Sequence, residues 1–214
     1  MATSIVIIPT YNEIENIEDI LRAVMALDPH FDVLVMDDGS PDGTADAVRT
    51  LQIEFKNRIH LIVRKEKSGL GTAYILGFKW ALEHQYQYIL EMDADFSHPP
   101  LKLLELRDKC ISGDADVAIG SRYVKGGGVV NWPFLRLFLS KSASIYVQLI
   151  TGMKVKDPTA GFVCYTRRVL EAIQLDNIQF VGYAFQIEMK YAAHKSGFKL
   201  CEVPIIFPDR IKGK

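Results

Sequence analysis

The stretch Tyr88–Pro100, Tyr-Ile-Leu-Glu-Met-Asp-Ala-Asp-Phe-Ser-His-Pro-Pro, combines a short apolar run with two carboxylates and a pair of prolines. The run from Ile89 to Met92 predicts a buried strand. The two prolines at the end of the stretch lack the backbone N–H groups that a strand needs, so the strand must end before them. Asp93 and Asp95 are therefore expected where this strand passes into a loop.

The spacing of Asp93 and Asp95 suits a metal site. In extended backbone, residues i and i+2 point to the same side, so both carboxylates can face one cation. Oxygen ligands of this kind suit Mg²⁺ or Mn²⁺, which usually keep some waters and bind through one or two carboxylates plus substrate phosphates. The alternative is a solvated turn, because Asp and Pro are both common in turns.

The composition is that of an ordinary globular protein. The 214 residues are 49% hydrophobic and 24% charged, with a net charge of −1, which gives no electrostatic reason to expect nucleic-acid binding. The cysteines are sparse and far apart, which predicts a reducing, cytoplasmic environment and no disulfide framework. The N-terminus is typical of a first strand and not of a signal peptide. No run of about 18 apolar residues predicts a spanning helix.

Strand-like and helix-like segments alternate through the first half of the chain. The expected strands are residues 5–9, 33–36, 59–63, 89–92 and 116–120. This alternation predicts a single α/β domain over residues 1–214, built on a mostly parallel, doubly wound sheet. Helical periodicity places Ile14 of the first helix and Leu76 of the third on inward faces.

Polar residues, glycines and prolines gather just after the carboxyl end of each expected strand. These clusters are residues 10–13, 37–44, 65–71, 93–100 and 121–122. Taken one at a time, they are turns that need no function. In open α/β sheets, however, ligands bind outside the carboxyl ends of the strands. We therefore expect five loops from separate parts of the chain to form one site.

Several of these motifs resemble those of a known family. Ile8-Pro9-Thr10-Tyr11-Asn12-Glu13 and Met36-Asp37-Asp38-Gly39-Ser40-Pro41-Asp42-Gly43-Thr44 are similar to the opening of a family 2 glycosyltransferase of the inverting, GT-A type. Further motifs resemble the dolichyl-phosphate (polyprenol-phosphate) mannose synthases, in the soluble form without membrane helices. They are Met92 to Pro100, Gly120 to Tyr123, Gly126 to Gly128 with Asn131-Trp132, Asp157 to Phe162, and Tyr183 to Glu188.

The resemblance implies a GT-A fold and a metal-dependent transfer of mannose, with inversion, from GDP-mannose to a polyprenyl or dolichyl phosphate. It assigns the guanosine to Pro9, Tyr11, Glu13 and Asp38, and the donor diphosphate to Arg210. It assigns Mg²⁺ or Mn²⁺ to Asp93, Asp95 and position 97, which is Ser97 here and Gln in some relatives. It assigns the acceptor phosphate to Arg122 and Arg136. Asp95, Arg122 and Arg136 are the expected catalytic residues.

The resemblance also bears on the setting of the protein. It implies peripheral attachment to the cytosolic face of a membrane and leaves room for a membrane-anchoring subunit. Relatives continue beyond the position of Arg210 with a Gly-x-Ser-Lys segment whose lysine contacts phosphate, so we expect that the C-terminal tail is truncated here.

The expected chemistry agrees with the residues that the chain contains. A phosphate acceptor has a second pKa of about 6, so it is largely dianionic at neutral pH and needs no general base. It does need charge compensation, which arginine supplies through a bidentate fork. The sequence correspondingly contains no Gly-x-Ser-x-Gly elbow.

Three local features each leave two interpretations open. His98 either fixes its loop through a hydrogen bond or contacts the metal from outside the ligand set. Gly69-Leu70-Gly71 either cradles phosphate or makes a tight helix entry. The apolar segment from Trp132 to Ile150, interrupted by Arg136 and Lys141, is either a buried amphipathic helix or one that lies at a membrane surface beside the lipid-phosphate entry.

Other functions also remain open. The chain is alternatively a polyprenyl-phosphate glucose synthase, a transferase with a soluble acceptor, or a non-catalytic subunit that binds nucleotide sugars. A sugar nucleotidyltransferase would carry a loop rich in glycine and arginine where this chain has residues 10–13. Both Asp93 and Asp95 are present together with Arg122, which disfavours a non-catalytic subunit.

Overall fold

The computed structural model of the protein describes residues 3–27, 31–65 and 69–209. The strands within those ranges are β1 (Ser4–Thr10), β2 (Asp32–Asp37), β3 (Ile59–Val63), β4 (Tyr88–Glu91), β5 (Val117–Ser121), β6 (Gly128–Val130), β7 (Val163–Thr166), β8 (Leu200–Pro204) and β9 (Ile206–Pro208). The helices are α1 (Ile17–Met25), α2 (Thr44–Glu54), α3 (Leu70–Glu83), α4 (Lys102–Ile111), α5 (Phe134–Thr151), α6 (Arg167–Ala172), the 3₁₀ helix η1 (Leu175–Asn177) and α7 (Tyr183–Lys195).

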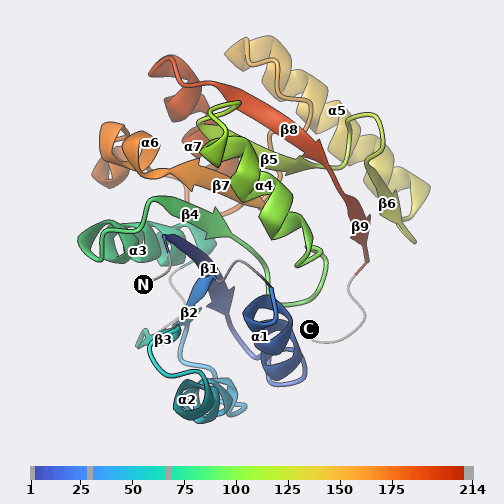
Figure 1. Cartoon of the computed structure of the whole chain (residues 1–214). Helices are drawn as coiled ribbons and strands as arrows, with labels where there is room; N and C mark the ends of the chain where they lie inside the picture. The colour runs from blue at the N-terminus through green and yellow to red at the C-terminus, as the bar shows by residue number, and fades with distance from the viewer. Residues whose placement is uncertain (1–2, 28–30, 66–68, 210–214) are drawn as a thin grey trace.

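A seven-stranded sheet in the order β3-β2-β1-β4-β7-β5-β8 forms the centre of the molecule (Figure 1). The β1–β2, β2–β3, β1–β4 and β5–β8 pairs are parallel, whereas β7 lies antiparallel to both of its neighbours. The prediction of a mostly parallel, doubly wound sheet in a single α/β domain is confirmed. A second, two-stranded sheet pairs β6 with β9.

Two hydrophobic cores cover the two faces of the large sheet. Alternate residues of β1 point to opposite faces: Val6 and Ile8 belong to the core packed by α1, α2 and α4, and Ile5 and Ile7 to the core packed by α3, α6 and α7. Strands buried on both faces read as continuous apolar runs, and this explains why the early strands are easy to find in the sequence.

Two predicted inward positions are wrong. Ile14 is 43% exposed, because α1 begins only at Ile17 and leaves it in the preceding turn. Leu76 is 41% exposed, because α3 buries Ala73, Tyr74 and Gly77 instead. The first error comes from extending the periodic pattern beyond the start of the helix, and the second from extending it beyond the face of the helix that meets the sheet.

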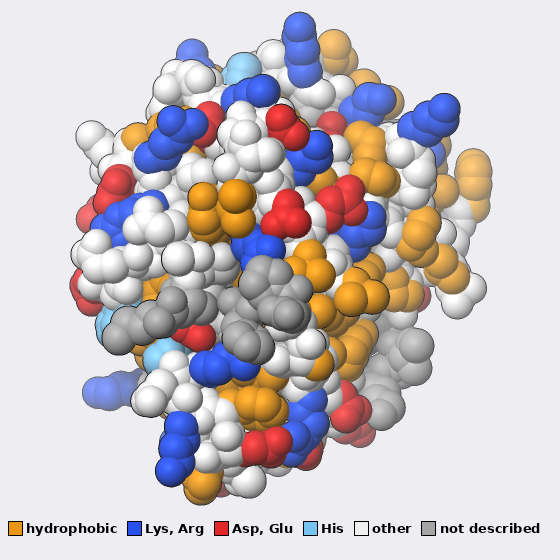
Figure 2. Space-filling model, viewed as in Figure 1, with side chains coloured by type: hydrophobic (Ala, Val, Ile, Leu, Met, Phe, Trp, Pro, Cys, Tyr) orange, Lys and Arg blue, Asp and Glu red, His pale blue; other side chains and the backbone are white. Residues whose placement is uncertain are grey.

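Helix α5 differs from the other long helices because nearly all of its apolar side chains are exposed. Ser144 is its only buried residue, and the structure therefore excludes the buried-helix interpretation of this segment. Figure 2 shows hydrophobic side chains gathered on the side of the molecule where α5 lies in Figure 1. Within the described part of the chain, no helix is both long enough and apolar enough to cross a bilayer.

Candidate active site

The carboxyl ends of the parallel strands β1, β2, β4 and β5 lie along one edge of the sheet. The loops that follow these strands carry most of the predicted site residues. Beside them lies a cleft of about 540 Å³. Its lining residues are Asp93, Asp95, Ser97, Arg122, Trp132, Arg136, Ser140, Thr159, Phe207 and Asp209.

Hydrogen bonds fix the turn after β4, which carries both predicted metal-binding residues. The backbone N–H of Asp93 donates to Nδ1 of His98 at 3.0 Å. The backbone N–H of Ser97 donates to Oδ1 of Asp95, also at 3.0 Å. Between them Phe96 has a φ of 61°, a left-handed conformation that is strained for a bulky residue and is found mainly at tight turns and functional sites. Asp93 and Asp95 both line the cleft.

His98 fixes this loop from a buried position. Its ring stacks on Phe162 with centroids 4.8 Å apart and meets Phe207 edge-on. Because Nδ1 accepts a hydrogen bond, the proton of the neutral ring lies on Nε2, and Nε2 is 3.9 Å from Oδ2 of Asp93. Burial lowers the pKa of His98, which favours this neutral form. The loop-fixing interpretation of His98 is confirmed.

The donor set on this loop fits a hard divalent cation. Ser97 is 2% exposed, and its Oγ has no hydrogen-bond partner in the described part of the chain. A buried hydroxyl without a partner costs free energy unless something else satisfies it. Among the described residues, no group of three or more His, Cys, Asp or Glu side chains is placed to hold a metal. Carboxylate and hydroxyl oxygens are the hard donors that Mg²⁺ and Mn²⁺ prefer, and Mg²⁺ usually completes its shell with water and phosphate oxygens.

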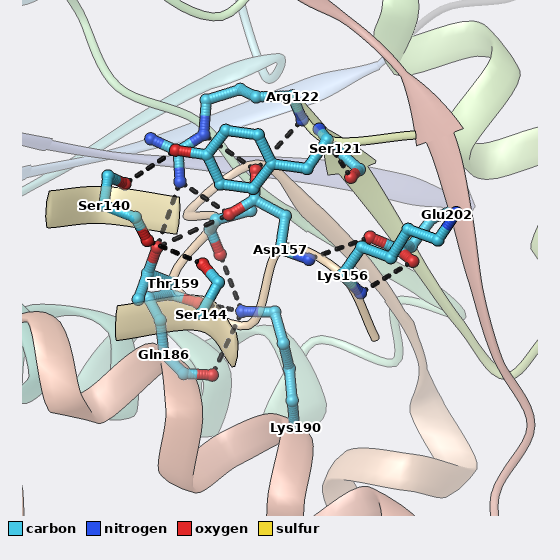
Figure 3. Close-up of polar contacts among 12 residues, drawn as sticks. Ser121, Arg122, Ser140, Ser144, Lys156, Asp157, Thr159, Gln186, Lys190 and Glu202 are labelled. Atoms are coloured by element: carbon cyan, nitrogen blue, oxygen red, sulfur yellow. Dashed lines mark hydrogen bonds and ion pairs between the residues drawn. The ribbon is translucent and has the colours of Figure 1, made fainter. Parts of the chain in front are cut away.

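Arg122 also lines the cleft and is held in a fixed orientation. Its Nε and Nη2 donate to the two carboxylate oxygens of Asp157 at 2.7 and 2.6 Å, and Nη2 also donates to Oγ1 of Thr159 at 3.0 Å (Figure 3). Burial opposes the charge on Arg122, but the hydrogen bonds to Asp157 outweigh it and raise the pKa of the guanidinium. Glu202 accepts the backbone N–H of Asp157 and so fixes the carboxylate that orients Arg122.

Aromatic rings surround both arginines of the cleft. The guanidinium of Arg122 lies 5.4 Å from the ring centroid of Trp132 and 5.5 Å from that of Phe207. Arg136, from the first turn of α5, stacks on Trp132 at 3.9 Å and donates to Asp209 at 2.8 Å. Rings that approach a guanidinium face stabilise its charge and exclude water from it.

The residues predicted to hold a nucleoside lie at the ends of β1 and β2, outside the lining of this cleft. The carboxylate of Asp38 accepts two hydrogen bonds from Arg64, at 2.5 and 2.7 Å. Glu13 is buried and accepts from Asn16 at 2.9 Å, Pro9 is half-buried and Tyr11 is 38% exposed. Arg210, predicted to bind the donor diphosphate, lies outside the described residues.

The Gly69–Gly71 turn is used for packing. Gly69 has a φ of +98°, and a Cβ on Gly71 would lie 2.7 Å from the carbonyl oxygen of Phe180. The N–H of Gly71 donates to the carbonyl of Val181. These contacts favour the tight helix entry over the phosphate cradle.

Some residues of the site were not predicted as such. Ser140, Phe207 and Asp209 line the cleft but have no individual signal in the sequence, and Thr159 lies in the Asp157 to Phe162 motif without having been assigned a role. Trp132 and Asp157 did have a signal, because both belong to motifs that resemble a known family. The role of Asp157 depends on a partner 35 residues away in the chain, so local spacing does not reveal it.

The mostly parallel sheet, with its cleft beside the carboxyl ends of the strands, is that of a glycosyltransferase with the GT-A fold. The family model described as "Glycosyl transferase family 2" matches residues 5–174, and the chain belongs to this family of glycosyltransferases.

The most similar relatives include several mannosyltransferases. The chain is 47% identical over 210 residues to a polyprenol monophosphomannose synthase of Mycolicibacterium smegmatis, covering 98% of this chain and 79% of the relative. It is 44% identical over 208 residues to an undecaprenyl-phosphate mannosyltransferase of Micrococcus luteus, covering 97% and 84%. A dolichol-phosphate mannosyltransferase of Pyrococcus furiosus is 37% identical, covering 98% of this chain and 57% of the relative.

Solved structures share the fold at much lower identity. A glucosyl-3-phosphoglycerate synthase of Mycobacterium tuberculosis, in complex with Mn²⁺, UDP and glucosyl-3-phosphoglycerate, has a TM-score of 0.67 and 15% identity over 99% of this chain and 72% of the other. A mannosyltransferase of Pyrobaculum calidifontis, in complex with GDP-Man and Mn²⁺, has a TM-score of 0.65 and 18% identity over 99% and 58%.

Proposed function

We propose that this glycosyltransferase moves mannose from GDP-mannose to a polyprenyl phosphate, with a bound Mg²⁺ or Mn²⁺. The observation that carries the proposal is the cleft itself, whose lining contains both Asp93 and Asp95 and both Arg122 and Arg136. Carboxylates that can hold a cation, in the same cleft as two guanidinium groups, suit a reaction between a sugar diphosphate and a phosphate. The names of the relatives support mannose as the sugar and a polyprenyl phosphate as the acceptor.

Asp93 and Asp95 would hold the cation, with Ser97 as a further oxygen donor, directly or through a water. When bound, a divalent cation neutralises the negative charge that develops on the departing diphosphate. Pro9, Tyr11, Glu13 and Asp38 would hold the guanosine at the ends of β1 and β2, and Arg210 the diphosphate. Arg64 fixes both carboxylate oxygens of Asp38, so a base would meet this carboxylate in a set orientation.

The guanidinium groups would position the acceptor phosphate. Asp157 and Thr159 occupy Nε and Nη2 of Arg122, whereas Nη1 makes no hydrogen bond within the described part of the chain. Arg136 is half-exposed and paired with an exposed carboxylate, an interaction that is weak in water and that a phosphate dianion can replace. A dianion held in this way attacks the anomeric carbon without a general base. Direct displacement gives a β-linked mannosyl phosphate by inversion.

Helix α5 would hold the protein against the cytosolic face of a membrane. Its exposed apolar side chains include Phe134, Leu135, Phe138 and Leu139, and Arg136 lies among them. Basic side chains beside an apolar face are typical of helices that lie in the interface of an anionic bilayer. Since Arg136 also lines the cleft, this helix would bring the phosphate of a lipid acceptor to the site.

Radiolabelled transfer with a matrix of donors and metals tests the proposal. We expect turnover with GDP-mannose and a short polyprenyl phosphate in the presence of Mn²⁺ or Mg²⁺, and its loss in EDTA. Faster turnover with another nucleotide sugar would contradict GDP-mannose as the donor. Binding of GDP and metal without transfer to any polyprenyl phosphate would contradict the proposed activity and favour a non-catalytic subunit.

A further inference from the structure

A buried polar network lies beneath the cleft and is not part of its lining. It consists of Glu91 on β4 with Gln186 and Lys190 on α7, which are 0%, 2% and 0% exposed. Charged side chains are almost never fully buried unless they are paired. Glu91 and Lys190 are therefore held in the core against a substantial desolvation cost.

The ammonium of Lys190 is fully used by this network. Nζ donates to the carbonyl oxygen of Ala160 at 2.6 Å, to the carbonyl oxygen of Gln186 at 3.0 Å and to Oε1 of Gln186 at 3.1 Å. Three acceptors match the three donors of an ammonium group. Gln186 in turn donates through Nε2 to Oε2 of Glu91 at 2.7 Å. Burial raises the pKa of Glu91 and lowers that of Lys190.

The two ends of the network adjoin two segments that line the cleft. Glu91 is the last residue of β4 and precedes Asp93 by two positions. Ala160 directly follows Thr159, which accepts a hydrogen bond from Arg122. The backbone N–H of Ala160 donates to the carbonyl of Asp157 at 3.2 Å. Figure 3 shows Lys190 reaching from α7 toward the segment that carries Asp157 and Thr159.

We propose that Lys190 is a positioning residue of the transferase: through Ala160 and Gln186 it keeps the segment that orients Arg122 in register with the carboxylates that follow β4. An apolar residue at position 190 would fill the same volume at lower desolvation cost. The hydrogen bonds that tie Lys190 to Ala160 and Gln186 explain why a lysine stands there. Kinetic evidence for this role depends on the proposed function, whereas the tether itself is measurable without substrate.

The substrate-free test is hydrogen exchange in the intact chain. In Lys190→Met, we expect amide exchange in residues 157–162 to accelerate about tenfold, because the carbonyl of Ala160 loses its partner. The control is Lys195→Met, which removes an exposed lysine from the same helix and is expected to leave this segment unchanged. Equal exchange in Lys190→Met and the wild type would overturn the tether, whether or not the chain transfers mannose.

The kinetic test separates positioning from general stability. If the wild type transfers mannose, we expect Lys190→Met to raise the KM for polyprenyl phosphate about tenfold and to leave the affinity for GDP and Mn²⁺, measured by calorimetry, within about twofold. A parallel loss of donor and acceptor binding, or an unchanged acceptor KM, would overturn the positioning role while leaving the proposed function in place.

A second variant guards against misfolding caused by a lone buried charge. Glu91→Gln/Lys190→Met removes both charges, so no unpaired ion remains in the core. We expect it to fold more stably than Lys190→Met and still to show the raised acceptor KM. Recovery of the wild-type KM in this double variant would show that charge imbalance, and not the tether to Ala160, caused the defect.

Discussion

Replacing Leu135 and Phe138 by glutamate is expected to detach the chain from lipid vesicles. Both side chains lie on the exposed face of α5, at 65% and 55% exposure. They are in no hydrophobic core, so their replacement does not remove a packing contact that the fold needs. The double variant therefore tests the surface of α5 without disturbing the sheet.

The magnitude follows from the surface that these side chains can still bury. Full burial of a Leu or Phe side chain stabilises by about 1.5–3 kcal/mol. Since roughly three-fifths of each is available, the pair contributes about 2–4 kcal/mol of transfer free energy. This corresponds to a fall of at least roughly 30-fold in vesicle partitioning. Repulsion between the new carboxylates and anionic lipid adds to the loss.

The assay is flotation of the purified chain with vesicles of phosphatidylcholine and phosphatidylglycerol. Because the chain is used alone, binding in this assay does not depend on an anchoring subunit. The control variant is Ile53→Glu on α2, which is 72% exposed and belongs to neither core; it is expected to float like the wild type. A double variant with a native circular dichroism spectrum that still binds within about threefold of the wild type would refute the role of α5.

Three further predictions concern other parts of the chain. Asp157→Ala leaves Arg122 buried without its carboxylate partner, and we expect the free energy of unfolding, measured with urea, to fall by about 3–5 kcal/mol. The double variant Arg122→Met/Asp157→Leu is expected to lose less stability. An equal loss in the two variants would contradict the ion-pair explanation. His98→Phe keeps an aromatic ring but removes the acceptor for the Asp93 N–H. The affinity for Mn²⁺ in the presence of GDP, measured by calorimetry, should therefore fall about 10-fold or more. Unchanged affinity would show that His98 does not support the metal-binding loop. Burial raises the pKa of Cys201 to about 11. Because the thiolate is the reactive form of cysteine, alkylation of Cys201 should be slow at neutral pH, and its rate should rise with pH until about 11. A rate that levels off below about pH 9 would disprove the raised pKa.

The amino-terminal half of the fold was predictable because its signals are local. The β1 residues Ile5 to Ile8 are fully buried, and a strand covered on both faces must be apolar throughout. Strand β7 was not predicted, although Val163 to Tyr165 is also a buried apolar run. A run this short does not indicate whether it enters a sheet, or in which direction.

Helix α5 marks another limit of sequence interpretation. An apolar helix with two basic residues has the same pattern whether it packs in a core or lies on a surface. The choice depends on whether other elements cover it, and in this structure they leave Leu149 and Ile150 exposed at 78% and 70%. Glu91 presents the opposite case, because it lay within the predicted apolar strand and proved to be a buried carboxyl group whose hydrogen-bond partner, Gln186, lies 95 residues away.

The sequence by itself determined the features that depend on neighbouring residues: the alternation of strands and helices, and the placement of Asp93 and Asp95 in one turn after a strand that must end. Only the tertiary structure decided which distant groups meet. Asp157 orients Arg122 from 35 positions away, and Lys190 reaches the carbonyl of Ala160 from 30 positions away. Such pairings depend on the order in which strands join the sheet, and that order is set by packing across the whole domain, which no local pattern records.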